Sequence, residues 1–316
     1  MVKMLFCSLF SLLSVSSFIA LSAVKAEWTQ VDTNGKWNAR AHLTSLVSGD
    51  SAYVISGGSS GNDKYNSDVW TTVDGATWNN NQNSTHFWDR TSHASVLSNG
   101  VMYVTGGYGN KYFNDVWSST DNGRSWVEAT SAAEWVGRQG HANVAVNGVI
   151  FVMGGESGSG KKNDVWSSRD GGVTWTAMPD APWSGRSFFG SFVYNNIIYV
   201  IGSHSDVWSS ADGANTWTNL TPYATNVYRV GLTAVEYSGD FYTMGGTDGM
   251  DSYNEVWKSA DLGVTWEQMP DPEWSPREYH SSAVLNGKLY VMGGGTGGQT
   301  SPDTFFDDVW VMSDDA

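Results

Sequence analysis

Hydrophobic residues in this chain come in short runs that end at turns rich in glycine and asparagine. The run Val101-Met102-Tyr103-Val104-Thr105 is typical, because it follows the hairpin signal Asn99-Gly100 and ends at Gly106-Gly107. Similar runs return along most of the chain. The pattern predicts many short β-strands joined by tight turns, and it disfavours helix bundles and coiled coils.

A six-fold repeat underlies these runs. In five copies a tryptophan precedes an arginine, and Tyr228 lies close to that place in the remaining copy. The arginines recur at intervals of 43 to 50 residues and are Arg40, Arg90, Arg138, Arg186, Arg229 and Arg277. Later in each copy comes a Val-Trp pair, at Trp70, Trp117, Trp166, Trp208, Trp257 and Trp310. Self-similarity at such a period indicates a repeat architecture.

Each copy contains four predicted strands. In the third copy the first strand begins at Arg138 and runs to the turn Asn147-Gly148, and the second ends at Gly154-Gly155. The third strand carries Val165-Trp166, and the fourth contains Trp175. A four-stranded unit of this length is a propeller blade. The sequence therefore predicts an all-β fold, a six-bladed β-propeller of four-stranded blades.

The last copy lacks its fourth strand, since no second tryptophan follows Trp310. The segment Glu27-Trp28-Thr29-Gln30 resembles Thr216-Trp217-Thr218-Asn219, which belongs to the fourth strand of another copy. We therefore predict that the N-terminal strand pairs into the last blade. This pairing would close the ring and leave no open edge between the two ends of the chain.

The first 26 residues have the pattern of a secretory signal peptide. Lys3 precedes an apolar stretch from Met4 to about Leu21, and Val24 and Ala26 occupy the −3 and −1 positions of a cleavage site. An uncleaved N-terminal anchor is the alternative. We expect residues 1–26 to be removed and residues 27–316 to form the propeller, in a periplasmic or extracellular location without membrane contact.

Charge and cysteine content narrow the function. Lys and Arg number 17 against 32 Asp and Glu, a net charge of −15, which excludes nucleic acid or an anionic membrane as the main partner. An anionic ligand would need a local basic site. The single cysteine, Cys7, lies in the leader, so the mature chain has no disulfide and no Cys-bound metal. We expect no metal, no cofactor and a monomer, with Asn83 and Asn219 as glycosylation acceptors in a eukaryotic host.

The unit of arginine, turn, Gly-Gly and Val-Trp resembles the kelch repeat over essentially all of residues 27–316. Within it, residues 168–175 are similar to the Asp-box hairpin of sialidase propellers. Residues 119–126 and 259–266 are similar to the same hairpin. A hydrogen-bonding role of the aspartate within its own turn is favoured over calcium binding or catalysis. Galactose oxidase also has a kelch-type propeller, but its Cys–Tyr crosslink at copper is impossible here.

Strand order places the arginines at one mouth of the central channel. The resemblance to kelch proteins implies that arginines at this place can bind carboxylates, sulfates or acidic peptides, and guanidinium groups suit such anions. The predicted ligand-binding residues are Arg40, Arg90, Arg138, Arg186, Arg229 and Arg277. The alternative is structural: the arginines would cap carbonyl groups between blades or pair with carboxylates such as Asp89 and Glu278.

Departures from the repeat mark further candidates. Glu156 follows a Gly-Gly pair at the mouth, Tyr228 and Tyr279 flank arginines, and His204 lies in the shortest loop. These four are the candidate catalytic residues, since a carboxylate, a phenol or an imidazole can transfer protons. The loop 295–308 is the longest and contains two phenylalanines. For the four histidines that follow arginines (His42, His93, His141 and His280), we expect packing or hydrogen bonding rather than metal binding.

Three functions are compatible with these features. The first is a secreted recognition module that binds an anionic small molecule, an acidic glycan or an acidic peptide at the arginines. The second is an enzyme acting on an acidic sugar, since bacterial N-acetylneuraminate mutarotases are similar six-bladed kelch proteins. The third is a surface adhesion or protein-interaction scaffold. The first is preferred because the sequence contains no recognisable catalytic motif.

Overall fold

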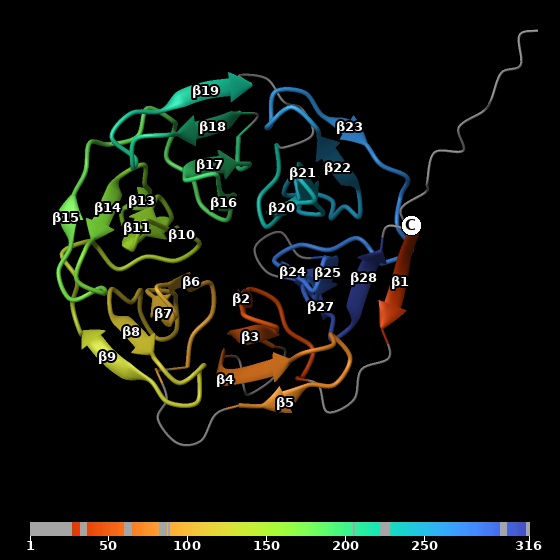
Figure 1. Ribbon diagram of the computed structural model, residues 1–316, viewed down its shortest axis with the longest axis horizontal. Helices are drawn as coiled ribbons and strands as arrows, with labels where there is room; N and C mark the ends of the chain where they lie inside the picture. The colour runs from red at the N-terminus through yellow and green to blue at the C-terminus, as the bar shows by residue number, and fades with distance from the viewer. Residues whose placement is uncertain are drawn as a thin grey trace, which may run out of the picture.

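Six four-stranded antiparallel sheets form a ring around a central axis in the computed structural model (Figure 1). The structure describes residues 27–31, 37–59, 65–81, 87, 89–204, 206–221, 228–297 and 302–313. In these ranges every regular element is a strand, and no helix is present that could cross a membrane. The predicted all-β, six-bladed propeller is therefore confirmed. The predicted leader, residues 1–26, and the acceptor Asn83 lie outside the described residues.

Each blade is a meander whose first strand lies nearest the axis. The first blade has β2 (Thr44–Ser48), β3 (Ser51–Gly58), β4 (Tyr65–Thr72) and β5 (Asn79–Asn80). The second has β6 (Ala94–Ser98), β7 (Val101–Thr105), β8 (Val116–Ser119) and β9 (Val127–Thr130). The third has β10 (Ala142–Val146), β11 (Val149–Met153), β14 (Val165–Ser168) and β15 (Thr176–Ala177).

The other three blades repeat this order. The fourth has β16 (Gly190–Tyr194), β17 (Ile197–Ile201), β18 (Val207–Ser210) and β19 (Thr218–Thr221). The fifth has β20 (Thr233–Tyr237), β21 (Asp240–Met244), β22 (Val256–Ser259) and β23 (Glu267–Gln268). The sixth has β24 (Ser281–Leu285), β25 (Lys288–Met292), β28 (Val309–Ser313) and β1 (Glu27–Val31). Two short hairpins, β12–β13 (Glu156–Ser157, Gly160–Lys161) and β26–β27 (Gly295–Thr296, Thr304–Phe305), project from the third and sixth blades.

The two ends of the chain meet in the sixth blade. Strand β1 pairs antiparallel with β28, with Trp28 opposite Met312, and Figure 1 shows the red first strand beside the blue last one. Trp28 and Met312 are both buried in one cluster between the fifth and sixth blades. The predicted closure by the N-terminal strand is confirmed.

Edge-to-face aromatic pairs fill the space between neighbouring blades. Trp135 meets Trp175 with ring centroids 6.0 Å apart and planes at 87°. In the second copy this position belongs to Phe87, which meets Trp126 at 5.2 Å, although the sequence pattern had assigned Trp88 to it. Trp88 itself lies outside the described residues. Such pairs add to the apolar burial that holds the blades together.

The first strand of each blade begins later than predicted. In the third blade β10 begins at Ala142, four residues after Arg138, because Gly140 adopts a left-handed backbone conformation with φ of 58°. The segment from the arginine to the strand forms the mouth of the channel instead.

The aspartate turns lie between the third and fourth strands. Asp170 accepts hydrogen bonds from the backbone N–H and the hydroxyl of Thr174 and from the Ser168 hydroxyl. Partial desolvation opposes ionisation, but these bonds hold the pKa of Asp170 below its ordinary value. This is the local role within its own turn that we expected for the aspartate.

Candidate ligand-binding site at the mouth of the channel

The six arginines of the repeat lie inside the blades. The guanidinium group of Arg138 donates to both carboxylate oxygens of Asp164, at 2.6 and 2.8 Å, and to the carbonyl oxygen of Gly154 at 2.7 Å. Every copy has such an ion pair: Arg40–Asp68, Arg90–Asp115, Arg138–Asp164, Arg186–Asp206, Arg229–Glu255 and Arg277–Asp308. Each acid also accepts a hydrogen bond from the indole of the Val-Trp tryptophan two residues later.

These ion pairs leave little positive charge for a ligand. Five of the guanidinium side chains are at most 1% exposed, and Arg229 is 11% exposed. Burial alone would raise the pKa of Asp164, but the hydrogen bonds from Arg138 and Trp166 hold it below its ordinary value. A ring of six arginines open to an anion, as predicted from the sequence, therefore does not form.

The structural alternative describes the arginines better, although its suggested partners were wrong. Neither Asp89 nor Glu278 pairs with a repeat arginine. The partners lie in the Asn-Asp-Val-Trp motif, and the acid repeats in all six copies with Glu255 in the fifth. This regularity was the sequence signal for the pairing. Its physical reason is that a buried guanidinium requires a carboxylate and several acceptors.

A closed ring of backbone hydrogen bonds surrounds the channel. The residue two positions after each arginine adopts a left-handed backbone conformation, with φ between 52° and 66°. Its N–H donates to the carbonyl group of the equivalent residue in the preceding blade, at 2.7 to 3.3 Å. The members of this inner ring are His42, Ser92, Gly140, Phe188, Gly231 and Tyr279. The ring links all six blades.

Three aromatic side chains of the inner ring gather across the axis. His42 stacks on Tyr279 with centroids 3.9 Å apart, and Phe188 meets Tyr279 edge-on at 5.1 Å. Gly140 and Gly231 make room for them, since a Cβ atom on either glycine would lie 2.8 Å from the ring of Phe188 or Tyr279. Burial lowers the pKa of His42 to about 3, so its imidazole is neutral.

A cavity of about 740 Å³ lies above the aromatic cluster, and we call it the mouth cavity. Its floor includes His42, Phe188 and Tyr279, while Tyr65 and Tyr108 belong to its wall. The other lining residues are Gly58, Ser59, Thr91, Ser92, Gln139, Glu156, Lys161, Ser187, Val230, Pro302 and Phe305. Tyr108 meets Tyr65 edge-on, with ring centroids 6.3 Å apart, so the two rings contact each other in the wall.

The rim of the mouth cavity is built from equivalent positions. In five blades the residue after the arginine forms a bridge to a residue at the end of the second strand or shortly beyond it, as in Thr91–Tyr108 and Gln139–Glu156. In the first blade the bridge is Ala41–Gly58, so Ser56-Gly57 is the equivalent of Gly-Gly there. The sequence alone would place the pair at Gly57-Gly58, one residue later, because a register irregularity between β3 and β4 is invisible in the repeat.

Unpartnered polar atoms occur at this rim. The hydroxyl of Thr91 lines the cavity, is buried, and makes no hydrogen bond within the described part of the chain. Glu278, at the equivalent place in the sixth blade, is 1% exposed, and neither of its carboxylate oxygens has a hydrogen bond of good geometry there. Burial raises the pKa of Glu278 to about 7 against a smaller opposing effect of the Thr247 hydroxyl. Buried atoms without partners also occur inside the blades, for example the indole nitrogens of Trp135 and Trp183, so it is the position of Thr91 in the cavity lining that makes its hydroxyl a candidate for a ligand.

The structure separates the four candidate catalytic residues. Glu156 and Tyr279 line the mouth cavity. Tyr228 is 57% exposed and lies outside the lining, as does His204, whose Nε2 lies 3.4 Å from the Gly185 carbonyl oxygen. From the sequence, Glu278 was identified only as a possible arginine partner, and Thr91, Tyr65 and Tyr108 were not identified at all. Their common signal is a place next to a repeat arginine or beside the end of a second strand.

Three of the four repeat histidines lie below the inner ring and bind hydroxyl groups. His93, His141 and His280 contact the Oγ1 atoms of Thr44, Thr105 and Thr233 through Nε2, at 2.8 to 3.0 Å. Burial lowers the pKa of His93 and of His280 to about 3. Throughout the described ranges, no three His, Cys, Asp or Glu side chains are placed to hold a metal ion.

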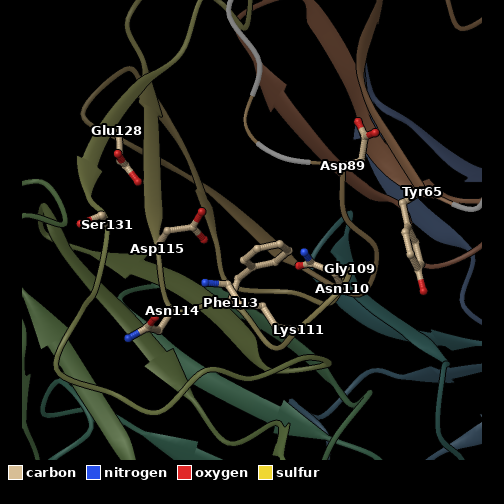
Figure 2. A pocket seen from close by; sticks show the side chains of 10 residues that line it. All are labelled: Tyr65, Asp89, Gly109, Asn110, Lys111, Phe113, Asn114, Asp115, Glu128 and Ser131. Atoms are coloured by element: carbon tan, nitrogen blue, oxygen red, sulfur yellow. The ribbon is translucent and has the colours of Figure 1, made fainter.

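A second cavity, of about 590 Å³, lies between the first and second blades (Figure 2). Figure 2 shows Asp115, Phe113 and Lys111 along its wall. The Asp115 carboxylate is already bonded to Arg90 and Trp117. The Phe113 ring is covered by the same guanidinium at 4.6 Å. These groups stabilise the blade, so the mouth cavity is the better candidate for a ligand site.

Comparison with known proteins assigns the class. The sequence matches the family described as the KLHDC2/KLHL20/DRC7 Kelch-repeats domain over residues 42–226, more than half of the chain, and the protein therefore belongs to this kelch-repeat family. Residues 202–311 also match the DUF6242 beta propeller domain. A search among curated proteins gave no match.

A solved structure shares the whole architecture. The structure described as "Structure of YjhT" superposes with a TM-score of 0.72 at 16% identity, covering 88% of this chain and 95% of that one. At this identity the likeness concerns the fold alone. The protein is thus a kelch-type six-bladed β-propeller, an architecture compatible with protein interaction or with a sugar-related role.

Proposed function

We propose that the protein is a recognition module that binds a saccharide in the mouth cavity. The observation that carries the proposal is the combination of an aromatic wall, Tyr65 and Tyr108, with the unpartnered hydroxyl of Thr91 in one cavity. Aromatic faces pack against the apolar faces of sugar rings, and buried unpaired hydroxyls gain from a sugar hydroxyl that completes their hydrogen bonds. The cavity volume is within the range of small-ligand sites.

Preference for an acidic ligand has less support than it had from the sequence. The arginines that would have attracted an anion are paired with carboxylates inside the blades. The net charge of −15 then acts against an anion without a local site of opposite sign. Acidic glycans and acidic peptides therefore belong in the test as ligands that we expect to bind more weakly than neutral saccharides.

The test is a binding titration of neutral, acidic and basic oligosaccharides, followed by NMR line broadening and calorimetry. Tyr108→Ala should weaken binding at least about tenfold through lost stacking, and Thr91→Val should weaken it by a smaller factor. Tyr228→Ala is the matched control, because this tyrosine is exposed outside the cavity. Equal loss in both tyrosine variants would contradict the proposal.

The same spectra separate the two alternative functions. New product signals or a changing anomer ratio would identify an enzyme, with Glu156 and Tyr279 as the residues to replace first. Absence of binding by every saccharide would favour an adhesion or protein-interaction scaffold. A slow signal change that persists after Tyr279→Phe would exclude this phenol from the chemistry.

We also propose that the protein works outside the cytoplasm. The support is the signal-peptide pattern of residues 1–26, in which Val24 and Ala26 occupy the −3 and −1 positions of a cleavage site. Mass spectrometry of the protein recovered from the medium or periplasm should give an N-terminus at Glu27. A chain that keeps residues 1–26 in the membrane fraction would instead support the anchor alternative.

A further inference from the structure

The mouth cavity and the second cavity share one side chain. Tyr65, the first residue of β4, lines both of them. Tyr108 lines the mouth cavity, whereas Asn110 and Lys111 line the second cavity and lie along its wall with Tyr65 in Figure 2. A ligand that extends past Tyr65 from the mouth cavity can therefore reach the second cavity.

A single loop of the second blade lies between the two cavities. Tyr108 in this loop lines the mouth cavity, and the next residue, Gly109, lines the second. The loop lies close against the segment before Arg90, since a Cβ atom on Gly109 would be 2.8 Å from the carbonyl oxygen of Asp89. The two cavities are thus separated by adjacent residues of one loop and by the ring of Tyr65.

The backbone holds Tyr65 at the junction of the first and second blades. Tyr65 pairs with Gly58 at the end of β3, and the carbonyl oxygen of Asn66 accepts a hydrogen bond from the Arg90 N–H of the second blade, at 3.1 Å. The ring of Tyr65 also contacts Tyr108 edge-on. An aromatic ring on so well-anchored a backbone is a preorganised surface, which lowers the entropic cost of binding a ligand.

The second cavity combines a buried wall with exposed polar side chains. Asp115 and Phe113, which stabilise the blade, are buried. The exposed lining residues are Asp89, Asn110, Lys111, Glu128 and Ser131. Among the residues that the structure describes, no ion pair involves the charged members of this set. Sugar hydroxyls both donate and accept hydrogen bonds, so they suit carboxylates, amides and an ammonium group alike.

Each cavity has the volume of a small-ligand site, about 740 Å³ for the mouth cavity and about 590 Å³ for the second. We propose that the ligand is an oligosaccharide chain that binds in the mouth cavity and continues across Tyr65 into the second cavity. A sugar chain repeats hydroxyls and apolar ring faces along its length, and therefore suits an aromatic ring between two polar cavities. This inference rests on the proposed saccharide site and adds the length of its ligand.

The experiment measures affinity against chain length. Calorimetry with the intact protein compares neutral saccharides of increasing length, from the monosaccharide upward, in one series built from glucose and one from N-acetylglucosamine. The affinity should rise at least about tenfold once the chain is long enough to pass Tyr65, because the added units then contact the second cavity.

Ser131→Trp should remove this gain and leave the affinity for the shortest ligands unchanged, because Ser131 is exposed and lines only the second cavity. Lys111→Ala, which removes a side chain instead of adding one, should reduce the same gain. The matched control is Thr120→Trp, since Thr120 is exposed in the same blade and lines neither cavity. Tyr65→Ala should weaken short and long ligands alike, because its ring lines both cavities.

The outcomes separate the two proposals. An affinity that does not change with length, with Tyr108→Ala still weakening it, overturns the oligosaccharide inference and leaves saccharide binding standing. A gain with length that persists in both Ser131→Trp and Lys111→Ala, or that the control variant loses as fully as Ser131→Trp, also overturns the inference. Binding of no saccharide at any length overturns the inference together with the proposed function.

Discussion

Trp28 packs edge-on against Trp274, with ring centroids 6.0 Å apart and planes at 84°, and so joins the N-terminal strand to the junction of the last two blades. Four other junctions use the same pairing between residues much closer in sequence. This one contact depends on closure of the ring, since its two partners come from opposite ends of the chain.

Loss of Trp28 should open the ring. We expect Trp28→Ala to lower the free energy of unfolding by about 3 kcal/mol, because a buried indole leaves a cavity at the closing strand. Deletion of residues 27–31 should remove most of the stability, since β28 then becomes an unpaired edge. Thermal and denaturant unfolding measure both effects. An unchanged midpoint in the deletion variant would refute closure by β1.

Removal of a repeat arginine should destabilise the protein. In Arg138→Ala the Asp164 carboxylate and the Gly154 carbonyl lose their common donor, and we expect a loss on the order of 3 kcal/mol. Arg169→Ala, in the same blade but exposed, should leave the unfolding midpoint almost unchanged. If Arg138→Ala were as stable as this control but lost ligand binding, the arginine would serve the ligand after all.

The inner ring has a steric requirement at Gly231. Gly231→Ala should lose on the order of 3 kcal/mol, because its φ is 66° and the new Cβ would meet Tyr279 at 2.8 Å. Gly49→Ala is a close comparison, with a φ of 58° and no atom within 4 Å of its Cβ, and should lose about 1 kcal/mol. The difference, measured by denaturant unfolding, isolates the contact with Tyr279. Equal losses would show that backbone strain alone decides both.

Glu278 should make the protein less stable as the pH rises. Its pKa is raised from 4.5 to about 7 on folding, so between these values the folded protein binds more protons than the unfolded chain. The free energy of unfolding should therefore fall across this interval, by on the order of 2 kcal/mol, and level off above it. Glu278→Gln should lack this part of the pH profile and be the more stable protein at about pH 8. If the free energy of unfolding had the same pH dependence in both proteins, the carboxyl group of Glu278 would be in contact with water and its pKa would not be raised.

Much of the fold could be predicted because each copy contains local signals that do not depend on distant contacts. Turns such as Asn147-Gly148 end strands by backbone preference, and the buried strands need runs of β-branched and aromatic residues. A count of tryptophans was enough to predict that the last blade lacks a fourth strand after Trp310 and that the segment beginning at Glu27 supplies it. Exact equivalences between copies were harder to predict. Only the packed blades show that Phe87, not Trp88, takes the tryptophan position of the second copy, and that Ser56, not Gly57, begins the Gly-Gly equivalent of the first copy.

The site depended on contacts that the sequence does not encode locally. A repeated arginine next to a strand has the same sequence pattern whether it faces a ligand or an internal acid. Three-dimensional packing decided the matter, since Asp164, directly before the third strand (β14) of the same blade, accepts both donors of Arg138. The burial of Glu278, which is 1% exposed, likewise becomes visible only in the folded protein.

By itself, the sequence determined the six blades, their strands and the closing of the ring, because hydrophobic period and turn chemistry act within a few residues. Only the tertiary structure decided which polar groups have partners and which lack them, because burial and hydrogen bonding depend on what neighbouring blades place around each side chain. That difference moved the candidate site from the arginines to the aromatic mouth cavity.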